Sequence, residues 1–522
     1  MLAAFGAVSL WILALDLFQV IAHGRIWTGT DGVYLVDQMQ YLAWIQSATH
    51  HLLSANLFVL RGTSADYFQP AVTISAGLAA LGIAPWVALL VWKPVAVLVA
   101  FFGFDFYVRR TVPGVWPRRA ALVLALFFGS FTVVEGSFGV VGDLFAGFLS
   151  WGYTFGLLAI GVMVLALLVY DSARRRGSRR LALGAALLGA GASSLHPWQG
   201  ELLILIVLGS EVAAWRGTRR RPGLMLPLAT IAATALPLIY YMILGRLDTS
   251  WELARVASKH AFSFWTIALA LAPLAIAALP ACRRRPRTFL ETVTRVWPLA
   301  AVAIFLLSAT ELSATPLHSF EGITLPLAVL AVEGVQRAGF GRLPHRRLIG
   351  GLAVAAVTIP TTYWELRNAH SLATPTPGNA NFITRGERDA LRYLAANRTP
   401  GGVLTRFYLG ALVPGETGRR TFVGDCLWSE PGCSWRAELA QRLLDGTVPA
   451  PEARQIVNQI GAPFVLADCA APPGLGRVLA PISSSVRRFG CATVYRLSAP
   501  GPPEGALAES APNAALRSPG RD

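Results

Sequence analysis

The sequence of 522 residues is 54% hydrophobic and only 14% charged, and its mean hydropathy is +0.51. Soluble domains are about a quarter charged, so this composition excludes an ordinary soluble protein and indicates several membrane-spanning segments. The formal net charge of +16 does not indicate nucleic-acid binding, because the arginines stand in separate clusters between apolar stretches and form no continuous basic face.

About eleven apolar stretches are candidate membrane-spanning helices, since a helix needs about 20 apolar residues to cross the hydrocarbon core. They cover residues 4–22, 86–106, 119–135, 148–170, 181–194, 199–214, 224–244, 264–282, 295–311, 321–338 and 349–366. The segment 69–83 is expected to add one more helix or a re-entrant piece. Asp16 and the lack of a basic stretch before residue 4 favour a retained first helix over a cleaved signal peptide.

The arginine clusters predict the orientation of these helices. With a cytoplasmic N-terminus, every cluster lies inside, as the positive-inside rule requires. The clusters are at 109–119, 174–180, 216–221, 283–287 and 337–347. The opposite side receives the first loop (about 23–68), 136–147, the His196 turn, 245–263, 312–320 and everything after 367. The high content of Ala, Arg and Gly suggests a GC-rich genome, so we expect a multi-pass protein of a bacterial inner (plasma) membrane.

The first outside loop holds the densest group of polar and aromatic residues. We expect a helix over 33–54 in which Asp37, Tyr41 and Trp44 share one face. Aromatic rings stack on the apolar face of a sugar and a carboxylate accepts a hydroxyl proton, so this face suggests a sugar site. Asp37 and Asp31 are its candidate catalytic acids. The alternative interpretation is an amphipathic helix whose Tyr and Trp anchor at the headgroups.

Other polar residues on the same side are candidate substrate contacts, because polar groups near membrane depth are costly. Glu135 and Asp143 in the second outside loop are suited to a divalent metal ion or an acceptor, and equally to a solvated loop. The candidates for binding a substrate or its lipid phosphate are His196, Arg255, Lys259 and His318; a structural or lipid-contacting role is the alternative for each. No nucleotide-binding glycine pattern occurs in a cytoplasmic loop, so no other cofactor is indicated.

Residues 368–498 are predicted to form a small α/β domain outside the cytoplasm. Thr384 and Glu387 have capping-box spacing at the start of a helix. Strands are expected at 403–407, 421–425, 464–468 and 492–497, and helices at 435–445 and 451–460. The last residues, 499–522, are rich in Pro, Ala and Gly, and we expect a disordered tail.

Four of the five cysteines lie in this predicted domain, at Cys426, Cys433, Cys469 and Cys491. An even set in an exported domain indicates disulfides. Cys426 and Cys433 are close enough to close a small loop, which leaves Cys469 with Cys491, although three pairings are open. A metal site is the alternative, but no C-x-x-C pair and no nearby histidine favour it.

Taken together, these features resemble the GT-C superfamily of polytopic glycosyltransferases. The resemblance rests on the long first loop with Asp37-Gln-Met-Gln-Tyr41-Leu, on Tyr67-Phe68-Gln69-Pro70 before the next apolar segment, and on acids in the second outside loop. The stretch from Gly386 through GRRTFVGD to GAPFVLAD is similar to the C-terminal domain of many bacterial relatives. The pair of acids in the first loop is six residues apart here, and the WWDxG-like signature of oligosaccharyltransferases is absent.

This resemblance implies a GT-C-like transmembrane domain over residues 1–367 that takes sugars from a polyprenyl-phosphate donor. We therefore expect an inverting transfer to a glycan, lipid or protein acceptor of the cell envelope. Asp37 would be the general base, and Arg255, Lys259 or His318 would stabilise the departing phosphate. A transporter or lipid flippase is the alternative function, but such proteins commonly show matched halves, and no internal repeat is evident.

Overall fold

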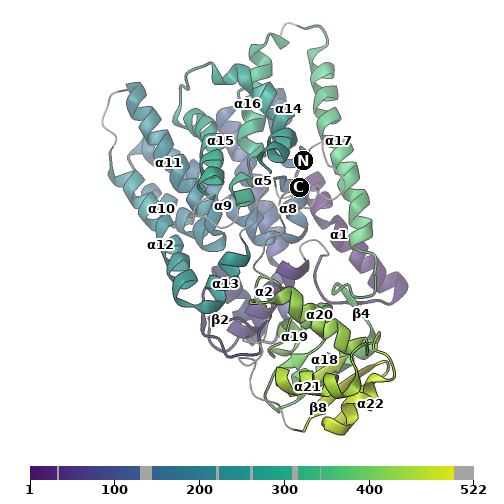
Figure 1. Cartoon of the computed structure of the whole chain (residues 1–522). Coiled ribbons are helices and arrows are strands. Elements are labelled where there is room, and N and C mark those ends of the chain that lie inside the picture. Colours follow the sequence, from purple (N-terminus) through teal and green to yellow (C-terminus); the bar gives the residue numbers. More distant parts are fainter. Residues whose placement is uncertain are drawn as a thin grey trace.

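A computed structural model describes residues 1–31, 35–129, 144–218, 223–258, 263–308, 316–340 and 343–498. Long helices form a bundle, and the C-terminal α/β region, residues 384–498, lies at one end of it beside the first loop (Figure 1). The bundle helices are α1 (Leu2–His23), α5 (Trp92–Thr111), α6 (Val115–Phe127), α8 (Ala146–Gly152), α9 (Thr154–Arg176), α10 (Arg179–Leu195), α11 (Pro197–Thr218), α12 (Met225–Leu247), α14 (Phe264–Cys282), α15 (Phe289–Leu307), α16 (Thr324–Arg337) and α17 (Arg346–Leu372).

Seven segments of the described chain are long and apolar enough to cross a membrane. They are Leu2–His23, Pro85–Thr111, Thr154–Arg176, Pro197–Arg216, Met225–Leu247, Phe264–Cys282 and Phe289–Leu307. Each of the other predicted spans also carries a helix, although a shorter or more polar one. The segment 69–83 forms an eleven-residue helix, α3 (Pro70–Ala80).

One predicted span differs from the structure, and another is described only in part. The stretch 148–170 is not one helix, because the chain breaks at Tyr153, which adopts φ −103° and ψ 50° between α8 and α9. This break turns the Tyr153 hydroxyl toward His196. The predicted span 119–135 is described only as far as residue 129, through α6 and its capping residue Phe128, and its remainder lies outside the described residues.

Close backbone packing holds the bundle together. A Cβ added to Gly161 of α9 would lie 2.8 Å from the backbone nitrogen of Ala100 in α5, so only glycine allows this approach. The two helices form the centre of the main apolar core, together with buried residues of α6, α11, α15 and α16. Many apolar side chains on the outside of the bundle remain exposed, as expected where lipid covers them.

The first loop folds into short elements on the bundle end. They are β1 (Ile26–Trp27), α2 (Leu35–Ala48), β2 (Ser54–Ala55), β3 (Ala65–Tyr67) and α4 (Pro85–Leu90). The helix predicted over 33–54 is therefore too long at its C-terminal end. The chain reverses at Leu52, which has a positive φ of 61°, and Ser54 then pairs with Tyr67 in an antiparallel ribbon.

The C-terminal α/β region has a four-stranded sheet of order β5-β6-β8-β7. β5 and β6 are parallel, and the other neighbouring pairs are antiparallel. Its elements are α18 (Arg385–Ala396), β5 (Val403–Leu404), α19 (Phe407–Thr417), α20 (Cys433–Leu444), α21 (Ala450–Ile460), β6 (Phe464–Ala467), α22 (Leu475–Leu479), β7 (Ser483–Phe489) and β8 (Ala492–Leu497). Thr384 and Glu387 form the expected capping box at the start of α18.

Most of the expected elements of this region are present, but the strand predicted at 421–425 is wrong. Thr421 forms a single bridge to Val403, and the chain then passes tightly over α19, where a Cβ on Gly424 would lie 2.4 Å from the backbone of Gly410. Both expected disulfides, Cys426–Cys433 and Cys469–Cys491, are present. The first of them closes the loop that follows the misassigned segment.

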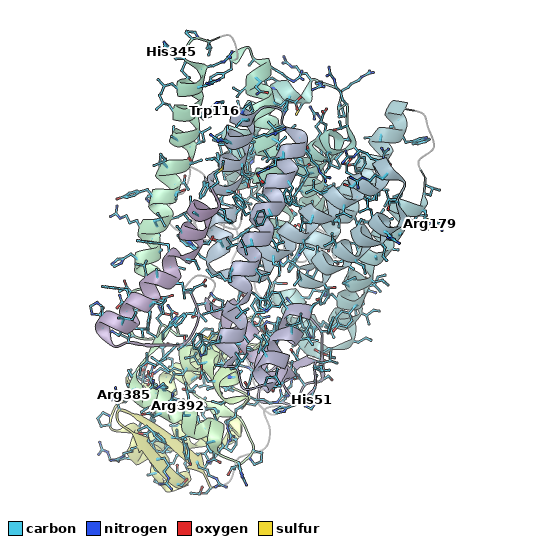
Figure 2. All side chains as sticks on the ribbon, turned by 180° about the vertical axis from the view of Figure 1, so that it is seen from behind. His51, Trp116, Arg179, His345, Arg385 and Arg392 are labelled. Atoms are coloured by element: carbon cyan, nitrogen blue, oxygen red, sulfur yellow. A yellow bond between two sulfur atoms is a disulfide. The ribbon has the colours of Figure 1, made fainter. Side chains whose placement is uncertain are left out.

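The C-terminal region is docked onto the first loop through backbone contacts. β1 pairs with β4 (Phe382–Ile383) in antiparallel register, although the two segments are more than 350 residues apart. Thr421 donates its backbone N–H to the Leu57 carbonyl at 2.9 Å. Figure 2 shows His51 of the first loop at the same end of the molecule as Arg385 and Arg392, with Trp116 and His345 at the opposite end.

Candidate active site

Asp37 lies in the first turn of α2 and is partly buried. Burial raises the pKa of its carboxyl to about 6, and the nearby positive charge of His318 acts in the opposite direction. Tyr41, one turn further along α2, has its pKa raised by burial and then by the charges of Asp37 and of Glu321. These interactions place a carboxyl with a pKa near neutrality beside groups from distant parts of the chain.

His196, His318 and Glu321 form a compact cluster next to Asp37. One candidate ligand atom from each lies within 4.8 Å of the others. His196 follows α10, His318 belongs to the short helix η1 (Pro316–Phe320), and Glu321 follows η1. The His318 Nδ1 contacts Glu321 Oε1, and the His196 Nδ1 lies 3.6 Å from Glu321 Oε2. Burial lowers the pKa of His196 and raises that of Glu321.

Neighbouring side chains hold this cluster in place. The Tyr153 hydroxyl shares a hydrogen bond of 2.7 Å with His196 Nε2, and its ring is stacked parallel to the His318 ring. The Trp198 ring packs on both histidines, with centroid distances of 4.7 and 4.4 Å. Gln199 donates to Glu321 Oε2 at 3.2 Å. The three side chains are therefore positioned by both ring stacking and hydrogen bonds.

Asp31, the other candidate acid of the first loop, is paired with Lys93 at the start of α5. Each side chain is only 2% exposed. The Lys93 Nζ also donates to the carbonyl oxygens of Ser150 and Trp151, at 2.7 and 3.2 Å. Three segments, the first loop, α5 and α8, thus meet at one buried ammonium group.

Trp44 lies in an aromatic cluster that joins the first loop to both other parts of the molecule. Its ring centroid is 4.3 Å from that of Tyr67, 5.9 Å from that of Trp251 and 5.3 Å from that of Trp428. Trp251 belongs to α13 (Thr249–Ala257), and Trp428 belongs to the loop closed by Cys426–Cys433. Because Trp44 is 5% exposed, its ring is covered by these neighbours.

Asp425 precedes the disulfide-closed loop and extends the acidic site. Its side chain is 1% exposed, and its Oδ2 has no hydrogen-bond partner in the part of the chain that the structure describes. Burial, and next the charge of Asp37, raise the pKa of Asp425 to about 8. Asn56 of the first loop donates to the Trp428 carbonyl at 2.9 Å, which fixes the position of this loop.

The structure thus brings several predicted site residues together, namely Asp37, Tyr41, His196 and His318. Arg255 lies one turn beyond Trp251 on α13. Glu135, Asp143 and Lys259 fall outside the described residues.

Sequence reasoning missed Lys93, Glu321 and Asp425. Lys93 carried a usable signal, since it is one of only two lysines and stands in an apolar stretch. Glu321 also carried one, three residues after His318, whereas the sequence around Asp425 does not indicate its proximity to the first loop.

The chemistry of the site follows from the difference in pKa between two acids, Asp37 and Asp425. At neutral pH an acid with a pKa near 6 is mostly ionised and accepts a proton, while one with a pKa near 8 is mostly protonated and donates a hydrogen bond. Asp37 and Asp425 have these two properties. The histidine–glutamate cluster beside them offers nitrogen and oxygen ligands suited to a divalent metal ion.

No protein-family model and no curated protein matches the sequence. Among solved structures, the apo crystal structure of the Archaeoglobus fulgidus oligosaccharyltransferase is similar, with a TM-score of 0.54, 13% identity, and coverage of 90% of this chain and 69% of that chain. The complex of that enzyme with Zn and sulfate gives a TM-score of 0.51, 13% identity, and coverage of 88% and 68%. ArnT from Cupriavidus metallidurans gives 0.49, 14%, and coverage of 94% and 97%. Identities this low show the fold alone, which is that of the Archaeoglobus fulgidus oligosaccharyltransferase.

Proposed function

We propose, from this shared GT-C fold and from the acids gathered at one end of the bundle, that the chain is an integral membrane glycosyltransferase. It transfers a sugar from a polyprenyl-phosphate donor to a glycan, lipid or protein acceptor of the cell envelope. The observation that carries the proposal is the partly buried Asp37, whose pKa of about 6 suits a general base, beside the histidine–glutamate cluster.

In the proposed reaction Asp37 accepts the proton of the acceptor hydroxyl. The acceptor oxygen forms a bond to the anomeric carbon of the sugar from the face opposite the phosphate. The bond between that carbon and the phosphate oxygen breaks, and its electron pair leaves with the polyprenyl phosphate. This displacement inverts the anomeric configuration, and general-base assistance of this kind contributes about 10²–10⁴-fold to the rate.

The departing phosphate needs positive charge or hydrogen-bond donors. His318 lies in the cluster beside Asp37, and Arg255 is on α13, next to the aromatic cluster of Trp44 and Trp251. Lys259 follows α13 and is proposed for the same role. A divalent ion held by the cluster would supply further positive charge to the phosphate when bound; the similar Archaeoglobus fulgidus enzyme has been solved with Zn and sulfate.

Asp425 is proposed to contact the acceptor. Its pKa of about 8 keeps the carboxyl mostly protonated at neutral pH, so it can donate a hydrogen bond to an acceptor oxygen while Asp37 removes the proton.

The proposed location is the bacterial inner membrane, with about eleven spanning helices and with the site and the C-terminal domain (368–498) outside the cytoplasm. The arginine clusters support this orientation. Polyprenyl-linked donors also suit a face without nucleotides. The transporter or flippase alternative gains no support from the similar structures or from the described residues of this site.

Turnover of labelled donors tests the proposal. Purified protein in liposomes is incubated with undecaprenyl phosphates that carry different radiolabelled sugars, together with envelope lipid and glycan extracts. We expect one or more donors to release undecaprenyl phosphate and to pass the label to an acceptor. Asp37→Asn should lower this rate about 10²–10⁴-fold.

The matched control is Asp66→Asn, an acid of the same loop in β3 whose side chain is partly exposed. It should retain wild-type turnover. Movement of the intact labelled lipid across the membrane without breakage of its sugar–phosphate bond would instead indicate a flippase.

A further inference from the structure

His196 has a buried nitrogen whose bonding requirement no described residue meets. The side chain is 3% exposed, and its Nδ1 has no hydrogen-bond partner among the described residues. The carboxylate oxygen Glu321 Oε2 is 3.6 Å away, beyond hydrogen-bond distance. A buried polar atom without a partner is unusual in a folded protein and indicates a missing ligand, ion or water.

The hydrogen bond on the other side of the imidazole strengthens the argument for a cation beside Nδ1. If His196 Nε2 donates its proton to the Tyr153 hydroxyl, its Nδ1 presents a lone pair toward a carboxylate oxygen. Two electron pairs facing each other in a buried place repel unless a cation lies between them. A metal ion bound to both atoms removes this repulsion, and the Tyr153 contact then orients the imidazole as outer partners of metal ligands do.

Glu321 also lacks a permanent positive partner. Its side chain is fully buried and pairs, within the described chain, with the two histidines and with the neutral amide of Gln199. Neither lysine nor arginine in that part of the chain forms an ion pair with it. A buried carboxylate is costly unless it is paired or coordinates a metal.

We propose that His196, His318 and Glu321 bind one divalent metal ion of the zinc class. Two imidazoles and one carboxylate are a ligand set of catalytic zinc sites, which keep a fourth position open. Ligand atoms on a tetrahedral zinc lie about 3.3 Å apart, as follows from metal–ligand distances of about 2.0–2.1 Å. The three candidate atoms already lie within 4.8 Å of one another, so small side-chain movements close the site.

This set differs from the metal site predicted at Glu135 and Asp143, because its ligands come from the turn between α10 and α11 and from η1 and the residue that follows it. The inference concerns binding and holds whether or not the chain transfers a sugar. If the proposed function is also correct, the ion would lie close to Asp37, whose pKa is affected by the charge of His318.

Metal binding by the whole protein tests the inference directly. The protein is purified with a tag that contains no histidine, reconstituted in nanodiscs, treated with a chelator and titrated with ZnCl₂ by calorimetry. Bound zinc is counted by mass spectrometry, and Co²⁺ is used as a spectroscopic substitute. We expect one zinc per chain, and with Co²⁺ a visible absorption spectrum of a four-coordinate site.

Variants then assign the ligands. His196→Gln, His318→Gln and Glu321→Gln should each weaken zinc binding at least 100-fold, and Tyr153→Phe should weaken it about 10–100-fold. The matched control is His50→Gln with His51→Gln, an adjacent pair of exposed histidines after α2; it should bind like the wild type. Tyr153→Phe keeps the test available if a ligand variant does not fold.

Equal zinc binding by the wild type and by folded ligand variants would overturn the inference, as would no zinc binding by the wild type. Neither result depends on donor turnover. Zinc binding without turnover would support the metal site and count against the glycosyltransferase proposal. Turnover without zinc binding would support the glycosyltransferase proposal and count against the metal site.

Discussion

The ammonium group of Lys93 in α5 contacts the Asp31 carboxylate of the first loop, and both side chains are almost completely buried. This ion pair ties the first loop to the bundle, and the backbone N–H of Asp31 donates to Gln38 of α2 at 3.2 Å. It also changes what Asp31 is expected to do, because a carboxylate that neutralises a buried lysine is a structural partner before it is a catalytic group.

Asp31→Asn should therefore destabilise the protein strongly. Removal of one partner of a buried pair costs about 3–5 kcal/mol, since the other charge remains buried. We expect a large fall in the thermal midpoint of Asp31→Asn and of Lys93→Met, measured in detergent. The double variant should lose less than the sum of the two. Additive losses would show that the pair contributes no coupling energy.

The pH dependence of turnover should report the two acids of the site. Asp37 acts as a base only when ionised, so the rate should fall about tenfold per pH unit below its pKa of about 6. Asp425 is proposed to act when protonated, so the rate should fall again above about pH 8. Because the two carboxyls interact, the apparent pKa values of the acid and alkaline limbs of the pH profile describe the pair and not either residue alone. Asp425→Asn, which cannot ionise, should lose the alkaline limb and keep the acid limb; loss of both limbs would contradict the assignment.

Asp37→Asn should leave the stability unchanged or raise it. The folded pKa of Asp37, about 6, is above its ordinary value of 3.8, because burial disfavours the charged form. Such a raised pKa destabilises the folded state above about pH 6, and the penalty disappears below the unfolded pKa. The thermal midpoint of Asp37→Asn relative to wild type should thus be higher at pH 7.5 than at pH 4.5. A lower midpoint at pH 7.5 would assign Asp37 a structural role.

Removal of one disulfide should mainly lower activity, and removal of the other should mainly lower stability. Cys426–Cys433 closes a short loop that carries Trp428 and follows Asp425, whereas Cys469–Cys491 contacts Thr384 at the start of α18. The loop-closure entropies predict losses of about 2.5 and about 3.4 kcal/mol respectively. We expect the double serine variant at 426 and 433 to lose at least tenfold in turnover and the variant at 469 and 491 to lose more stability. The reverse order would remove Asp425 from the site.

Fusions to alkaline phosphatase test the orientation. The enzyme folds only outside the cytoplasm, so a fusion after Gly378, beyond the end of α17, should be active, and a fusion after Arg176 at the end of α9 should be inactive. The exposed arginines at the end of α9 support this expectation. An active fusion at Arg176 would invert the topology and place the proposed site in the cytoplasm.

The positions of the bundle helices could be predicted because apolar length is a local property of the sequence. The break at Tyr153 could not, since the apolar run continues through it and the Tyr153 hydroxyl contacts His196, which is 43 residues away. The pairing of Cys426 with Cys433 could be predicted from their spacing. The strand at 421–425 was assigned from local composition, but the close approach of Gly424 to Gly410 decides its conformation.

The candidate site could be predicted only where its residues are close together in the sequence. Asp37 and Tyr41 are one helical turn apart, so their shared position follows from the sequence alone. The approach of Glu321 and Asp425 to them depends on how η1 and the C-terminal region dock, which no short-range pattern encodes. The sugar-stacking role expected of Trp44 also depends on docking, because Trp251 and Trp428 cover its ring.

The central claim is that Asp37 acts as the base in sugar transfer from a polyprenyl phosphate. The most direct measurement is release of undecaprenyl phosphate from radiolabelled undecaprenyl-phosphate sugars by wild-type protein and by Asp37→Asn in liposomes. We predict acceptor-dependent release by the wild type, a decrease of about 10²–10⁴-fold in Asp37→Asn, and no decrease in Asp66→Asn. Equal release by wild type and Asp37→Asn, or no release by the wild type from any donor, would contradict the claim.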